Sequence, residues 1–115
     1  MSDETTKLVS PSKRFPGHIV VPHPDYLRGD QFNQIRLISE RRDKQKLDLS
    51  HSAAQKMAYV AAEFVADNGE WAIDGLTLDE FRACDSAPEK EPVSFAMWFG
   101  GAFSDWVNEV TNPKG

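Results

Sequence analysis

The histidines near the start of the chain are the residues best suited to bind a metal. His18, His23 and Asp25 lie close together in the sequence. Imidazole and carboxylate groups are ordinary zinc ligands, but a structural zinc site normally needs four ligands in a tight arrangement. The only other histidine is His51, and the first two histidines lie among prolines, which favour a loop or strand. We therefore predict no metal site.

The single cysteine is the strongest nucleophile that the sequence offers. Cys84 is followed directly by Asp85, and an adjacent carboxylate raises the pKa of a thiol instead of lowering it. The pair Asp79-Glu80 is typical of the first turn of a helix, where carboxylates interact favourably with the helix dipole. The sequence contains no G-x-S-x-G, Walker A, G-x-G-x-x-G or H-E-x-x-H motif. We therefore predict no catalytic residue, no cofactor and no enzymatic activity.

The last quarter of the chain is rich in large aromatic side chains, which indicates burial or contact with a partner. Residues 92–110 contain five of them: Phe95, Trp98, Phe99, Phe103 and Trp106. On a helix, the large apolar positions of this segment cover an arc of roughly 180°, which is wider than an ordinary core-facing stripe. Gly100-Gly101 interrupts the segment and either permits close helix packing or allows a kink. Two interpretations stay open: all the aromatics fill the core, or some form a groove for a partner.

Composition and charge narrow the classes of function. The chain has 115 residues, of which 40% are hydrophobic and 27% charged, as expected of one globular domain in a reducing cytoplasm. Residues 51–115 carry four basic and eleven acidic residues, which argues against nucleic-acid binding. The basic cluster Arg41, Arg42, Lys44 and Lys46 is typical of a helix C-terminus. No apolar run approaches the roughly 20 residues that span a membrane, and the first residues do not resemble a secretory signal.

The order of apolar and turn-forming residues predicts a mainly α fold with a minor β element. We expect a flexible tail over residues 1–14 and a single globular domain over residues 15–115. Helices are predicted from Asp25 or Asp30 to Lys46, from Ser50 or Ser52 to a left-handed stop at Asn68-Gly69, and over residues 77–83 and 92–110. An edge strand at residues 18–21 is predicted to pair with a strand at residues 70–76. The expected architecture is a compact bundle of three to four helices with a short two-stranded β element.

Three segments of the chain resemble the small tail assembly chaperones of long-tailed (siphovirus-like) bacteriophages. The first is FPGHIVVPHPDYL, similar to an aromatic-Pro-Gly opening with a β-prone segment. The second is WAIDGLTLDEF, similar to a Trp-apolar-x-Gly-Leu segment with a short acidic stretch ending in Phe. The third is the aromatic helix ending in VTNPKG. Leu27-Arg28-Gly29-Asp30-Gln31 departs from the family pattern, which has a Leu-x-x-Pro-x-Gln step there.

This resemblance implies a non-enzymatic protein of the host cytoplasm that keeps the tape-measure protein soluble during tail assembly. An apolar groove would bury the apolar faces of that long helical partner by helix-in-groove packing. The negative net charge would keep the complex soluble. Partner-binding candidates are Trp98, Phe99, Phe103, Tyr26 and Phe32. No nucleic acid or membrane is expected as a partner, and a homo-oligomer is left open.

Two other functions are compatible with the sequence. One is a structural tail or head-completion subunit that stays in the virion, where mass spectrometry of purified particles would find it. The other is an acidic phage-encoded inhibitor that mimics DNA. This inhibitor ranks lower because the acidic residues are scattered over predicted helix ends and loops instead of forming one array.

Overall fold

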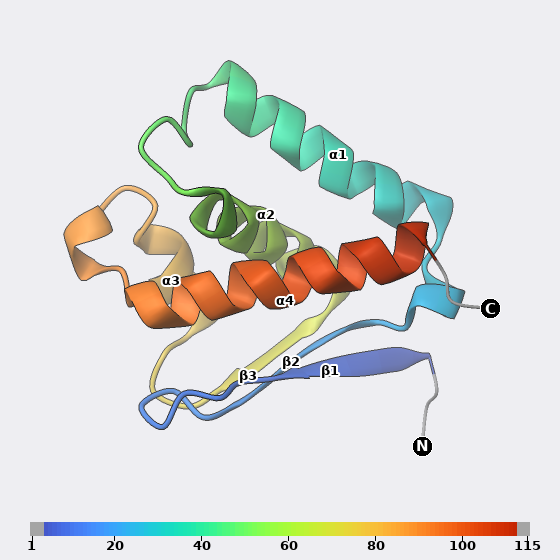
Figure 1. Cartoon of the computed structure of the whole chain (residues 1–115), viewed down its shortest axis with the longest axis horizontal. Helices are drawn as coiled ribbons and strands as arrows, with labels where there is room; N and C mark the ends of the chain where they lie inside the picture. Colours follow the sequence, from blue (N-terminus) through green and yellow to red (C-terminus); the bar gives the residue numbers. More distant parts are fainter. Residues whose placement is uncertain (1–3, 113–115) are drawn as a thin grey trace.

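The computed structural model describes residues 4–112, which form four α-helices and a three-stranded antiparallel sheet (Figure 1). In chain order the elements are β1 (Thr5–Val9), β2 (Gly17–Pro22), η1 (Pro24–Tyr26), α1 (Gly29–Lys44), α2 (Ala53–Asn68), β3 (Glu70–Ile73), α3 (Leu78–Ala83), η2 (Pro88–Lys90) and α4 (Val93–Thr111). The mainly helical fold with a small sheet agrees with the sequence prediction. No helix in the described part of the chain has the length and apolar character to cross a membrane.

The sheet corrects three predictions, because it has three strands in the order β1-β2-β3. Thr5–Val9 form a strand where a flexible tail was expected, and residues 1–3 of that tail lie outside the described residues. The threonines of β1 favour strands but are polar. Buried and exposed positions alternate along β1, but the sequence there shows no alternation of apolar and polar residues that would predict a strand. The strand at residues 18–21 is therefore central and not at an edge, although its predicted pairing with the strand that contains Trp71 is confirmed.

The helix ends follow local capping chemistry. Ser52 and Thr77 cap α2 and α3, and the side chains of Gln55 and Glu80 complete the two capping boxes. Helix α1 begins at Gly29 after Arg28, so Asp30 lies in its first turn. Gly69 ends α2, but its φ of −149° is extended and the predicted left-handed stop is wrong. These caps explain why α2 and α3 begin where their sequences predict.

Glycines allow two close approaches that hold the sheet and helices together. A Cβ on Gly69 would lie 2.1 Å from the carbonyl oxygen of Val20, so β2 can pass the end of α2 only because residue 69 is glycine. A Cβ on Gly100 would lie 1.8 Å from the carbonyl oxygen of Ala54, which brings α4 against the start of α2. The close-packing interpretation of Gly100-Gly101 therefore holds for Gly100.

Helix α2 is the centre of the molecule. It packs against α1, α3, α4 and the strands β2 and β3. The sheet lies along one side of α4. Helix α1 lies on the far side of α2 from α4 and the sheet (Figure 1). Trp106 fixes α4 to the sheet, because its indole N–H donates to the carbonyl oxygen of Pro22 at 2.9 Å in a buried site. This packing leaves the face of α4 next to β1 partly open.

Candidate functional site

Two of the predicted partner-binding residues belong to the core. Phe99 and Phe103 have no exposed surface. Phe99 packs edge-on against Trp71 and Phe81, and Phe103 packs on Phe64. Their prediction as groove residues is therefore wrong in this fold, because the wide apolar arc of α4 is covered by the sheet on one flank and by α2 on the other.

Trp98 is the predicted partner-binding residue that does line an open surface. Its ring is half-buried, and it packs against Phe95 and Phe99 with ring centroids 5.5 and 6.2 Å away. Its remaining surface faces an open groove of about 360 Å³ between β1 and α4. We call this the β1–α4 groove. Leu8 and Ala102 add apolar surface to it, Asp105 and Glu109 add acidic groups, and Lys7 adds one basic residue at its β1 side.

Tyr26 and Phe32 are exposed, but they lie apart from Trp98. Their exposed fractions are 53% and 36%. Tyr26 is in η1, which packs against α4, and Figure 1 places η1 and the start of α1 by the C-terminal end of that helix. Trp98 is in the second turn of α4, about 20 Å from Thr111 at 1.5 Å per residue. The five candidates therefore do not form one site.

A buried ionic cluster joins the end of α1 to the segments before α2 and after α3. The guanidinium of Arg42 donates to Asp48 at 2.7 Å and to Asp85 at 2.9 Å, and it lies 5.5 Å above the ring of Tyr59. His51 contacts Asp48 through Nδ1 at 3.1 Å. Only 4% of the Arg42 side chain is exposed. Sequence reasoning missed this cluster because Arg42 is part of a basic run that looks like a solvated helix end, and Asp85 lies far along the chain.

The environment of this ionic cluster favours its charged state. Burial alone would lower the pKa of Arg42, but its hydrogen bonds to Asp85 and Asp48 outweigh that effect and raise the pKa above its ordinary value. Burial alone would raise the pKa of Asp48, but its hydrogen bonds with Arg42 and His51 lower it. Arg42 and Asp48 therefore stay ionised and paired, which is the behaviour of a structural clamp between helices.

A second open cavity of about 430 Å³ lies beside the ionic cluster. Its charges are balanced: the basic groups are Arg41, Arg42 and Arg82, and the acidic groups are Glu63, Asp79 and Asp85. Arg42 and Asp85 are already bonded to each other, and Arg41 is paired with Glu63. With both signs present and mostly paired, this cavity selects neither a cation nor an anion. We therefore take the β1–α4 groove as the better candidate for binding.

The residues that could do chemistry remain separate. His23 and Asp25 approach to 3.8 Å, but His18 is on β2, and no group of three or more metal-ligating side chains forms among residues 4–112. Cys84 is buried, and its thiol donates to the carbonyl oxygen of Glu80. Burial, followed by the charge of Glu91, raises the pKa of this thiol. A thiol held in this way is a poor nucleophile.

Comparison with known proteins does not assign this fold or site. No protein-family model matches the chain, and no curated protein or solved structure matches it. Support for a function therefore comes from the geometry of the chain and from the three resembling segments. Of the third segment, Pro113, Lys114 and Gly115 lie outside the described residues.

Proposed function

We propose that this chain is a tail assembly chaperone of a long-tailed bacteriophage, which binds the tape-measure protein and catalyses no reaction. The observation that supports this most directly is Trp98 in the β1–α4 groove. A tryptophan with part of its ring exposed beside a cavity is typical of a binding hot spot. The groove also offers Leu8 and Ala102 as apolar surface for an apolar segment of the partner.

The charge of the molecule is compatible with this role. The formal net charge is −5, which favours solubility of a complex whose partner exposes apolar surface. The acidic groups of the groove, Asp105 and Glu109, are at the C-terminal end of the apolar part. An incoming segment is therefore selected by apolar and charged contacts together.

Co-expression with the tape-measure protein tests this proposal. We expect the chain to raise the soluble fraction of the tape-measure protein, and Trp98→Ala to weaken the complex about 30-fold, because hot-spot truncation costs at least about 2 kcal/mol. Met97→Ala is the matched control: it is the neighbouring residue on α4, 43% exposed, and it contacts Ser52 at the start of α2. The thermal unfolding midpoint of each variant is compared with that of the wild-type chain to check that the variant is folded.

Two results would count against the proposal. If the tape-measure protein stays insoluble in the presence of the wild-type chain, the proposed chaperone function is wrong. Equal loss of binding in Trp98→Ala and Met97→Ala would remove the β1–α4 groove as the site. Mass spectrometry of purified virions distinguishes the related structural role, since a chaperone leaves before the particle is complete and a tail subunit remains.

A further inference from the structure

The outer edge of β1 carries main-chain groups that no described residue bonds. The amide of His23 donates to the carbonyl oxygen of Glu4 at 2.7 Å, and the amide of Ser10 donates to that of Gly17 at 2.9 Å. Hydrogen-bonded pairs alternate along an antiparallel ladder. The even-numbered residues of β1 therefore face β2, and the outward N–H and C=O groups belong to the odd-numbered residues Thr5, Lys7 and Val9.

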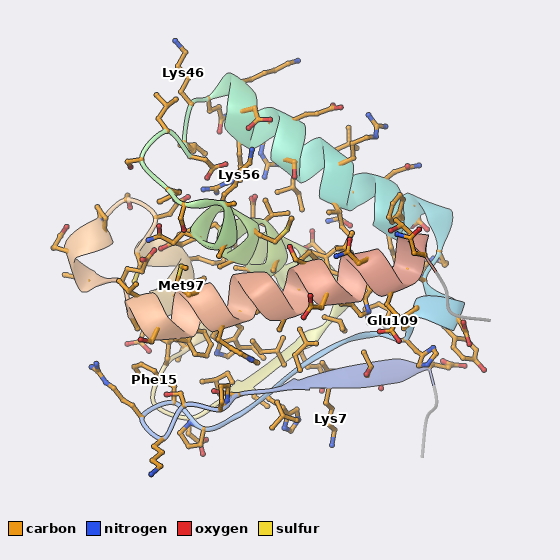
Figure 2. The ribbon with its side chains drawn as sticks, viewed as in Figure 1. Lys7, Phe15, Lys46, Lys56, Met97 and Glu109 are labelled. Carbon is orange, nitrogen blue, oxygen red and sulfur yellow. The ribbon has the colours of Figure 1, made fainter. Side chains whose placement is uncertain are left out.

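The β1–α4 groove runs along this edge. Thr6 and Leu8 are half-buried on the face of β1 that meets α4. Lys7 also lines the groove, but it is exposed and its side chain extends away from α4 (Figure 2). In a strand added to the edge, successive side chains would point to opposite faces. Every second side chain of the added strand would therefore enter the groove, beside Trp98 at one end and beside Asp105 and Glu109 toward the other.

The spacing of these groups defines the side chains that fit. Along α4, Asp105 and Glu109 lie about 10 and 16 Å from Trp98 at 1.5 Å per residue. Two strand residues four positions apart are separated by about 13 Å and share one face. The fitting segment has an apolar residue next to Trp98 and a Lys or Arg four positions away, between the two carboxylates. Figure 2 shows Glu109 on α4, near the sheet.

The charge of Lys7 argues against a second copy of this chain as the occupant. Two copies paired edge to edge about the centre of β1 would place one Lys7 opposite the other, and like charges directly opposite destabilise a strand pair. In the part of the chain that the structure describes, Lys7 has no ion pair. An acidic side chain on the outer face of a different partner would supply one.

We propose that β1 binds an extended segment of a partner protein as a fourth strand of the sheet. The segment has an apolar residue and a basic residue four positions apart on its groove-facing side, and an acidic residue on the other side. This inference rests on the proposed protein-binding role of the groove, and it adds the conformation and the chemistry of the bound segment. Main-chain bonds to Thr5, Lys7 and Val9 provide affinity, and the groove provides selectivity.

A labelled heptapeptide tests this proposal on the full chain. The probe is fluorescein-TLTVEKT-amide, whose Leu and Lys face the groove when its Glu faces outward. Fluorescence anisotropy should show saturable binding, and replacing the Lys of the probe by Glu should weaken it at least tenfold. Successive N–H groups of the bound probe would point alternately toward β1 and away from it. N-methylation of the nitrogens that face β1 should abolish binding, while N-methylation of the other nitrogens should change the affinity less than threefold. Equal effects of the two sets, or no binding at millimolar peptide, overturn the proposal.

A variant of the chain gives an independent readout. Lys7→Pro removes an outward N–H without removing a β1–β2 hydrogen bond, and proline is tolerated at sheet edges. We expect it to weaken probe binding at least tenfold, whereas Lys7→Ala, which keeps the amide, should weaken it less than threefold. Wild-type affinity in Lys7→Pro would overturn the proposal. If Lys7→Pro lowers the unfolding midpoint, the N-methylated probes decide on the wild-type chain.

The two proposals fail in distinguishable ways. If Trp98→Ala loses the tape-measure protein but Lys7→Pro retains it fully, strand addition is wrong and the chaperone function stands. If the probe behaves as expected but the tape-measure protein stays insoluble beside the wild-type chain, the β1 site stands and the chaperone function is wrong.

Discussion

At the scale of single residues, burial decides what each reactive or aromatic side chain can do. Trp98 is only partly buried, while Phe99 one position later is fully enclosed. Periodicity predicts which side chains share a helix face, but it does not say how far a sheet or a second helix covers that face. Trp98 could therefore be placed among the candidates from sequence, but it could not be separated from Phe99 and Phe103.

Cys84 provides a test at this scale. Its side chain is buried and hydrogen-bonded to Glu80, and its pKa lies above the ordinary value. At pH 8 the native thiol is therefore mostly protonated and shielded, so we expect a thiol reagent such as DTNB to label it at least tenfold more slowly than in the denatured chain. Equal labelling rates in buffer and in denaturant would show that the segment around Cys84 opens freely.

At the scale of elements, helix caps could be predicted from the sequence, but the pairing of β1 with a distant strand could not. The capping boxes of α2 and α3 involve residues three positions apart. The sequence therefore predicted the start of α3 at Thr77 and limited the start of α2 to Ser50 or Ser52. Strand β1 gave no comparable signal, because its threonines are polar and its pairing depends on β2. The β1–α4 groove brings residue 8 next to residue 98, and no local pattern encodes such a contact.

The two adjacent glycines of α4 give opposite predictions. Gly100→Ala would place a Cβ 1.8 Å from the carbonyl oxygen of Ala54, whereas a Cβ on Gly101 meets nothing within 4 Å. We expect Gly100→Ala to lower the free energy of unfolding by about 1–3 kcal/mol, because the added methyl group overpacks this contact. Gly101→Ala should raise it by about 0.5–1 kcal/mol, because alanine favours the helix.

Chemical denaturation of the two glycine variants measures this difference. A similar change of the unfolding free energy in both would contradict the close contact between α4 and the start of α2. Because the two positions are neighbours in one helix, each variant is the control for the other.

At the scale of the whole molecule, the ionic cluster around Arg42 connects segments that are distant in the chain. Asp48 precedes α2, and Asp85 follows α3, so one guanidinium holds both segments against the end of α1. A buried ion pair contributes little net stability compared with apolar residues, but losing one partner is costly. The fold of this region therefore depends on the ionisation of its carboxylates, which makes its stability sensitive to acid.

The acid sensitivity has a defined sign. The pKa of Asp48 in the folded chain lies below its ordinary value of 3.8, so its stabilising effect is complete above that pH and is lost as the pH falls through the lower folded value. We expect the free energy of unfolding to decrease below about pH 4.

Asp48→Asn should lower the free energy of unfolding at pH 7 by about 3 kcal/mol, because Arg42 loses a buried partner. It should also weaken the acid dependence. Asp43→Asn is the control, since its bond to Lys56 is exposed and is worth less than about 1 kcal/mol. Equal effects of the two substitutions in urea unfolding between pH 3 and 7 would show that the cluster is not a clamp.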